Sequence, residues 1–102
     1  MRAKRKDANH NPVQEHLEKL GWSVADTSAL GYGFPDLVVS RPGFTVVIEI
    51  KDGSKCPSDR KLTPAEETFK KNWTGPYVLA LDPEDAAKQL NALYAQWFWS
   101  PA

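Results

Sequence analysis

The sequence predicts one α/β domain, in which a short hairpin lies inside a sheet that helices cover. Three observations lead to this fold class: a helical stripe near the N-terminus, two β-rich runs joined by a turn, and two helix starts marked by a cap, a proline and an acid. A chain of 102 residues has room for one hydrophobic core and not for two. We therefore expect a single domain over residues 1–102 with the element order α-β-β-β-α-β-α.

The first part of the chain predicts a helix, a strand and a loop. Val13, Leu17 and Leu20 recur at helical spacing, and Gly21 follows at the place where helices favour glycine as they end. A helix is therefore expected over about residues 11–20. Residues 22–25 predict a short strand, and residues 29–35 contain two glycines and a proline, which predict a loop.

The middle of the chain predicts a β-hairpin. Residues 36–40 and 44–51 are β-rich, and the turn-forming residues Arg41-Pro42-Gly43 separate them. In a strand, alternate side chains point to opposite faces of the sheet. The second run therefore has one face with Phe44, Val46, Ile48 and Ile50 and another with Thr45, Val47, Glu49 and Lys51. Because both faces carry apolar residues, we expect a central strand.

The last part of the chain predicts two helices with a strand between them. Residues 52–62 are polar and form a long loop, and residues 63–66, Thr-Pro-Ala-Glu, form a capping box that starts a helix running to about Trp73. Residues 77–81 predict a short buried strand. Residues 82–85, Asp-Pro-Glu-Asp, then start a last helix, whose apolar stripe consists of Leu90, Leu93, Tyr94 and Trp97.

Composition indicates a soluble, cytoplasmic protein with no membrane partner. The chain is 41% hydrophobic and 25% charged, and no apolar run approaches the roughly 20 residues of a membrane span. The basic N-terminus is not followed by the apolar segment of a secretory signal. A single cysteine, Cys56, excludes an internal disulfide and fits a reducing compartment. Thirteen basic residues balance thirteen acidic ones, so net charge does not identify a polyanionic partner.

The hairpin turn predicts which side chains oppose one another. If Pro42 and Gly43 are the two turn residues, Arg41 pairs with Phe44, and Asp36 then faces Glu49; a three-residue loop would shift the pairing by one position. Opposed residues have Cβ atoms about 4.5–5.5 Å apart, and Lys51 lies two residues beyond Glu49 on the same face. Two carboxylates and an ammonium are therefore expected on one small surface.

This group of side chains predicts a metal site. Two adjacent carboxylates repel unless a cation lies between them, and Mg²⁺ or Mn²⁺ takes oxygen ligands from such pairs. The backbone carbonyl of Ile50 could point toward the same ion, and Lys51 could stabilise negative charge on a phosphodiester. The alternative is a surface pair, Glu49 and Lys51, on an exposed edge strand. Against this alternative, Glu49 interrupts a hydrophobic run, where a charge is unexpected.

The same residues resemble a known nuclease superfamily. Phe34-Pro35-Asp36, Glu49-Ile50-Lys51 and the helix start at residues 62–66 resemble the PD-(D/E)XK nucleases, specifically the small phage-type members of the VRR-NUC and Holliday-junction-resolvase-like branch. The similarity covers nearly the whole chain from Asp7. It implies a restriction-endonuclease-like core, with a central mixed sheet flanked by helices, and a divalent-metal-dependent DNA endonuclease, with branched or structured DNA as one candidate substrate. It also implies that Asp36, Glu49 and the Ile50 carbonyl hold the metal and that Lys51 positions or activates the water. The sequence leaves duplex, single strand, flap and four-way junction open as substrates, and RNA as well.

The sequence departs from the superfamily pattern on its first helix. Many members carry an additional acid at the place that Pro12 occupies here. Glu15, about one turn later, could substitute as a metal ligand, or it could be an ordinary solvent-facing residue. This departure favours a second function, a catalytically weak or inactive nucleic-acid-binding module on the same fold.

Basic and aromatic residues outside this group are candidates for contacts with partners. Lys55, Arg60 and Lys61 in the long loop, and Arg5 and Lys6 near the N-terminus, could contact DNA phosphates or could be solvated charges. Residues 97–99, Trp-Phe-Trp, are more aromatic than the end of a helix requires. Either a homodimer contact or packing of the terminus onto its own domain would account for them.

Overall fold

The computed structural model describes residues 8–99 and contains three α-helices and four strands. The elements are α1 (His10–Lys19), β1 (Ser23–Asp26), β2 (Leu37–Arg41), β3 (Phe44–Ile50), the 3-10 helix η1 (Pro57–Arg60), α2 (Pro64–Asn72), β4 (Tyr77–Ala80) and α3 (Pro83–Trp99). The predicted order of helices and strands is confirmed. The loop predicted over residues 52–62 differs in one respect, because η1 forms within it.

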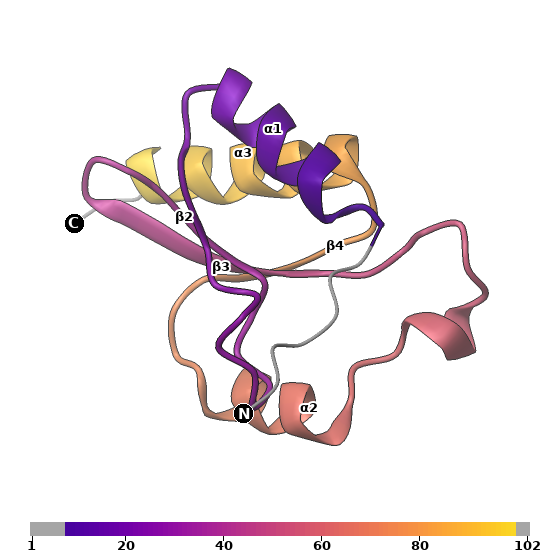
Figure 1. Ribbon diagram of the computed structural model, residues 1–102. Helices are drawn as coiled ribbons and strands as arrows, with labels where there is room; N and C mark the ends of the chain where they lie inside the picture. The colour runs from indigo at the N-terminus through magenta and orange to yellow at the C-terminus, as the bar shows by residue number, and fades with distance from the viewer. Residues whose placement is uncertain (1–7, 100–102) are drawn as a thin grey trace.

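The four strands form one mixed sheet in the order β1-β2-β3-β4. The first three strands are antiparallel neighbours, and β4 runs parallel to β3. The strand β3 is therefore interior, as its two apolar faces predicted. Helices α1 and α3 cover one face of the sheet, and α2 lies on the opposite face (Figure 1).

The hairpin has the register that the turn predicted. Arg41 pairs with Phe44 and Leu37 pairs with Ile48, so Pro42 and Gly43 are the two turn residues. Gly43 has a φ of 78°, and a proline followed by a glycine with positive φ is the pattern of a type II turn. A turn of fixed length thus determines the face of the sheet that each side chain occupies.

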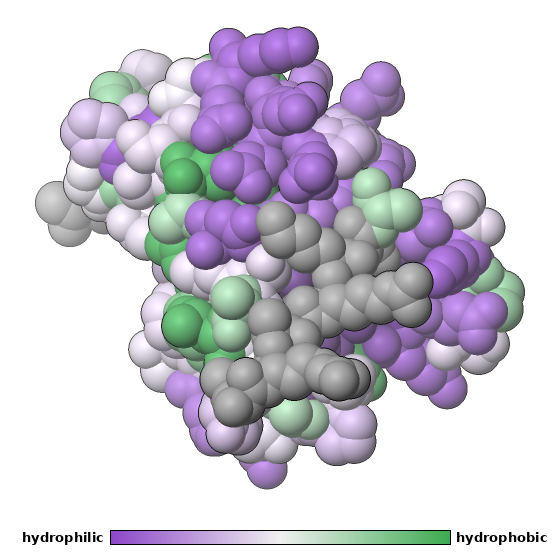
Figure 2. Space-filling view, viewed as in Figure 1, coloured by the Kyte–Doolittle hydropathy of each residue, from purple (hydrophilic) through white to green (hydrophobic). Residues whose placement is uncertain are grey.

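The hydrophobic core lies between the sheet and the pair of helices α1 and α3. The residues of β3 that face these helices are all buried, and they pack with buried residues of both helices: Val13, Leu17, Ala86, Ala87 and Leu90. Hydrophilic side chains cover the outer side of α1 (Figure 2). The prediction that Leu20 belongs to the buried stripe of α1 is wrong, because Leu20 is the C-cap residue and its side chain is 42% exposed. The chain reverses at Gly21, and Trp22 enters the core instead.

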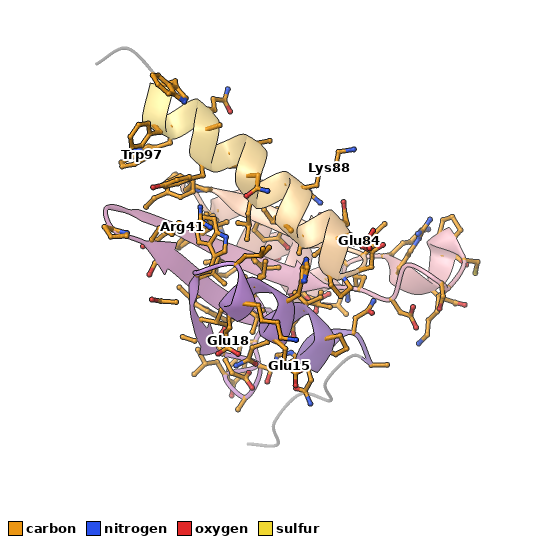
Figure 3. The ribbon with its side chains drawn as sticks, turned by 90° about the horizontal axis from the view of Figure 1, so that it is seen from above. Glu15, Glu18, Arg41, Glu84, Lys88 and Trp97 are labelled. Carbon is orange, nitrogen blue, oxygen red and sulfur yellow. The ribbon has the colours of Figure 1, made fainter. Side chains whose placement is uncertain are left out.

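An aromatic cluster supports the turn end of the hairpin. The Trp97 ring centroid lies 5.4 Å from that of Phe44, and Tyr94 contacts both rings. The guanidinium carbon of Arg41 lies 4.2 Å from the centroid of the Trp22 ring, which also belongs to the cluster (Figure 3). Trp97 therefore packs onto its own domain, which was one of the two expectations for the aromatic C-terminal segment.

The loop between β1 and β2 packs against α2. The Phe34 and Phe69 ring centroids are 5.2 Å apart. Gly33 has a φ of 79°, and a Cβ at this position would clash with the carbonyl of Ala65 and lie 2.8 Å from the amide nitrogen of Glu66. Glycine is therefore required here by the close approach of two backbones.

None of the helices within residues 8–99 is long and apolar enough to cross a membrane.

The close contact between Gly33 and the backbone of Ala65 predicts that alanine is less well tolerated at position 33 than at Gly21, which also has a positive φ. We expect Gly21→Ala to lower the free energy of unfolding by about 1–2 kcal/mol, because its φ of 91° is unfavourable for alanine and no atom lies within 4 Å of the new Cβ. Gly33→Ala should lose a further 1–3 kcal/mol or so, because the Ala65 backbone must also move. Urea denaturation of the two variants and the wild type measures both losses. Equal losses in the two variants would contradict the proposed backbone contact.

Candidate active site

Asp36 and Glu49 lie opposite one another on the face of the sheet that α2 covers. Leu37 and Ile48 are paired and belong to the core, so the residues next to them, Asp36 and Glu49, are opposed and point to the other face. Asp36 is 2% exposed and Glu49 is 1% exposed. Two buried carboxylates therefore lie on this face of the sheet, one directly before β2 and the other in β3.

The carboxylate of Asp36 is held by the backbone of β3. Its Oδ2 accepts a hydrogen bond from the amide nitrogen of Ile50 at 2.7 Å. Thr27 holds the backbone at Pro35 and Asp36. Its backbone nitrogen donates to the Asp36 carbonyl, and its hydroxyl donates to the Pro35 carbonyl. Asp36 is thus fixed by hydrogen bonds to both its side chain and its backbone.

The carbonyl of Ile50 points toward the same edge of β3 as its amide group. In an antiparallel pair the N–H and C=O of one residue face the same neighbouring strand, so this carbonyl faces β2 beside Asp36. Continued past its last pair, Leu37 with Ile48, the register would bring Pro35 opposite Ile50, and a proline has no N–H to donate. Pro35 therefore cannot donate a hydrogen bond to the Ile50 carbonyl.

The ammonium group of Lys51 lies between two carboxylates. Its Nζ is 2.8 Å from Oε1 of Glu66 and 3.9 Å from Oε2 of Glu49, and the side chain is 16% exposed. The backbone of Lys51 is also fixed. Its nitrogen donates to the Ala80 carbonyl at 2.9 Å, and its carbonyl accepts from the side-chain Nδ2 of Asn9 at 3.2 Å. Lys51 is thus ordered in both backbone and side chain.

Glu66 connects this cluster to the start of α2. Its Oε1 accepts from the backbone nitrogen of Thr63 at 2.9 Å, and its own backbone nitrogen donates to the Thr63 hydroxyl at 3.2 Å. The predicted capping box is therefore confirmed. The contact with Lys51 was missed, because a capping box is a local pattern and carries no signal about a partner in another element. One oxygen of Glu66 both caps the helix and binds the Lys51 ammonium.

Tyr77 is a further member of the site that the sequence did not indicate. It pairs with Val47 on the neighbouring strand, and the Nζ of Lys70 lies 5.6 Å from its ring centroid. Burial raises the pKa of the Tyr77 hydroxyl above its usual value, and the negative charges of Glu49, Glu66, Asp36 and Glu67 raise it further. The acidic side chains therefore produce a negative potential at this position.

The other residues expected at the site do not join this cluster. Glu15 is exposed on α1 (Figure 3), and α1 covers the face of the sheet opposite to α2 (Figure 1). No group of three His, Cys, Asp or Glu side chains that could hold a metal occurs within residues 8–99, so the structure does not bring Glu15 to the pair of carboxylates. Lys55 and Lys61 are exposed, whereas Arg60 is half-buried and donates to the Gly53 carbonyl at 3.3 Å. Arg5 and Lys6 lie outside the described residues.

The arrangement fits a hard divalent cation better than a zinc ion. Mg²⁺ is usually bound through one or two carboxylates and keeps several water ligands, and Mn²⁺ also prefers oxygen ligands. Asp36 and Glu49 could supply two carboxylates to such an ion, and the backbone carbonyl of Ile50 is the further oxygen that the sequence suggested. A zinc site would need three or four ligands, mostly nitrogen or sulfur.

These observations define a small α/β protein with a buried carboxylate and lysine cluster between its mixed sheet and one helix. Comparison of the chain with protein-family models, with curated proteins and with solved structures gave no match.

The raised pKa of Tyr77 predicts a loss of stability at alkaline pH. The folded protein keeps the phenolic proton above pH 10, whereas the unfolded chain releases it near the ordinary value of 10.0. The free energy of unfolding should therefore fall as the pH rises above about 10. We expect Tyr77→Phe to remove this part of the decrease, as measured by urea denaturation between pH 9 and pH 11 or so. Tyr32→Phe, which removes an exposed phenol, is the control; an identical slope in wild type and Tyr77→Phe would contradict the assignment.

The ion pair between Lys51 and Glu66 makes a second prediction about stability. We expect Glu66→Gln to lower the free energy of unfolding by about 1–3 kcal/mol, because a charge-assisted hydrogen bond in a largely buried position is lost. The neighbouring Glu67→Gln is the matched control, since it removes an acid from the same first turn of α2 but is exposed. Thermal or urea unfolding at pH 7 compares the two variants. If Glu67→Gln were as destabilising as Glu66→Gln, the helix dipole and not the ion pair would account for the effect.

Proposed function

We propose that this protein is a divalent-metal-dependent DNA endonuclease with a PD-(D/E)XK active site, of the VRR-NUC and Holliday-junction-resolvase-like branch. The observation that supports this function best is the opposed, buried pair of Asp36 and Glu49 with the Lys51 ammonium beside it. The element order and the mixed four-stranded sheet are compatible with a restriction-endonuclease-like core.

Asp36, Glu49 and the carbonyl of Ile50 would hold Mg²⁺ or Mn²⁺. When bound, such an ion lowers the pKa of a water ligand and neutralises negative charge on the phosphodiester. The protein contributes a fixed geometry to this site, because the Ile50 amide already holds the Asp36 carboxylate in place. A carboxylate that is already held in place does not have to reorganise during the reaction. Such preorganised groups are a main source of electrostatic catalysis.

Lys51 would act on the phosphodiester itself. Its ammonium can donate to a phosphate oxygen or to the attacking water, and it stabilises the negative charge that develops as the bond is hydrolysed. Glu66 would be a positioning residue, because it restrains the Lys51 side chain through a 2.8 Å contact. Lys55 and Lys61 are exposed in the loop that follows β3, and their amines would contact DNA phosphates.

A DNA-binding protein without catalytic activity is the second function that we consider. The observation that favours it is that no third carboxylate completes a metal-binding group with the pair within the described part of the chain. Such a protein would bind DNA through the same basic residues and would not cleave it. The two functions therefore differ in one direct measurement, cleavage by the purified protein.

The nuclease function predicts metal-dependent cleavage that requires all three residues. We expect the wild type to cleave linear or branched DNA in Mg²⁺ or Mn²⁺ and to be inactive with a chelator. Asp36→Asn, Glu49→Gln and Lys51→Ala should each lower the rate by roughly a hundredfold or more. A gel assay over a panel of labelled duplex, single-stranded, flap and four-way-junction substrates measures this rate.

The matched control for these variants is Glu18→Gln, which removes an exposed acid from α1 and should retain full activity. Circular dichroism and thermal unfolding of each variant separate loss of catalysis from loss of the fold. Cleavage that persists in both Asp36→Asn and Glu49→Gln would refute the proposed nuclease site. Absence of cleavage by the wild type, together with specific DNA binding, would instead establish the binding module.

A further inference from the structure

Tyr32 is an exposed aromatic residue in an unusual backbone conformation. It has a φ of 55°, and within residues 8–99 it is the one residue other than glycine with a positive φ. Its side chain is 84% exposed. A left-handed conformation is unfavourable for any residue that carries a Cβ, and the exposed ring gains little from packing. Neither the backbone conformation nor the packing of the ring therefore explains why a tyrosine occupies this position.

The segment that carries Tyr32 is nonetheless held in place. Gly31 and Gly33, on either side of it, also have positive φ values of 70° and 79°. The Phe34 amide donates to the Gly31 carbonyl at 3.0 Å and closes the turn around Tyr32. Gly33 is fixed against the backbone of Ala65 and Glu66 in α2. The ring of Tyr32 therefore points into solvent, while contacts on both sides hold its backbone in place.

This loop also forms part of the candidate active site. Asp36 lies at its end, and Glu66, which the backbone of Gly33 contacts, holds the ammonium of Lys51. Figure 1 shows that the connection between β1 and β2 extends from the sheet to the side of α2. Tyr32 therefore lies in the loop that leads to Asp36, directly before the glycine that packs against the first turn of α2.

We propose that Tyr32 binds an unpaired DNA base by stacking and so selects substrates that have unpaired nucleotides beside the scissile phosphate. Aromatic side chains bind single-stranded nucleic acids in this way, and the contact tolerates any sequence because every base has a π face. The bases of a continuous duplex already stack on one another and do not offer a free face. The inference rests on the proposed function and names its substrate class: single strands, or the splayed strands of a branch.

The experiment measures DNA binding separately from cleavage. Equilibrium binding of the 102-residue chain is followed by fluorescence anisotropy, in the presence of a chelator so that no metal-dependent cleavage occurs. The probes are a labelled single strand, a fork with splayed ends and a continuous duplex of the same sequence. A single strand that contains 2-aminopurine reports stacking directly, because stacking on an aromatic ring quenches its fluorescence.

Three variants separate the ring from its backbone. Tyr32→Asn removes the ring but suits the left-handed conformation, because asparagine tolerates a positive φ. Tyr32→Phe keeps the ring and removes only the hydroxyl. Trp99→Asn is the matched control, since Trp99 is 80% exposed but lies at the end of α3, which covers the other face of the sheet.

We expect Tyr32→Asn to weaken binding of the single strand and the fork by roughly 5- to 100-fold and to abolish the 2-aminopurine quenching. Its affinity for the duplex should not change. Tyr32→Phe should retain both the affinity and the quenching, and Trp99→Asn should behave as the wild type does.

Two results would overturn the inference: unchanged single-strand affinity in Tyr32→Asn, or an equal loss of affinity for single strand and duplex. A wild-type protein that binds no single strand would overturn it as well. If the wild type cleaves no substrate in Mg²⁺ or Mn²⁺ but the binding results hold, the nuclease function fails while the stacking role of Tyr32 stands.

Discussion

The turn at Pro42 and Gly43 fixes the pairing of β2 with β3, and the rest of the structure depends on that pairing. With this register, Leu37 and Ile48 face α1 and α3, and the acids next to them face α2. The regular pairing ends with Leu37 and Ile48, and beyond it the carboxylate of Asp36 accepts a hydrogen bond from the Ile50 amide. The same constraint therefore places the apolar residues in the core and the charged residues in the site.

A second constraint connects α2 to the sheet. The Oε1 atom of Glu66 accepts hydrogen bonds from both the Thr63 amide and the Lys51 ammonium, so the first turn of the helix and the end of β3 are held by one atom. The loop that contains Gly33 packs onto the same turn of α2. Three segments that are distant in the sequence thus meet at one point, and their relative positions determine the distance between the carboxylates and the ammonium.

Much of this arrangement could be predicted from the sequence, because short-range patterns encode it. The hairpin register follows from the turn and the alternation of side chains, and the start of α2 follows from the sequence at residues 63–66. The positions of Tyr77 and Glu66 beside the acids could not be predicted, since both depend on contacts between distant elements. The periodicity of apolar residues predicts the buried side of the first helix, but it does not predict which face of the sheet the helix covers. For this reason the sequence left Glu15 as a candidate metal ligand.

The alternation of core and charged side chains along β3 has a consequence for how this strand can change during evolution. Ile48 and Ile50 fill the core, while Glu49 and Lys51 belong to the site. Deleting or inserting one residue within β3 would exchange these two sets and drive a carboxylate into the hydrocarbon interior. The length of β3 is therefore constrained, because a shift by one residue would move its apolar and its charged side chains to the wrong faces at once.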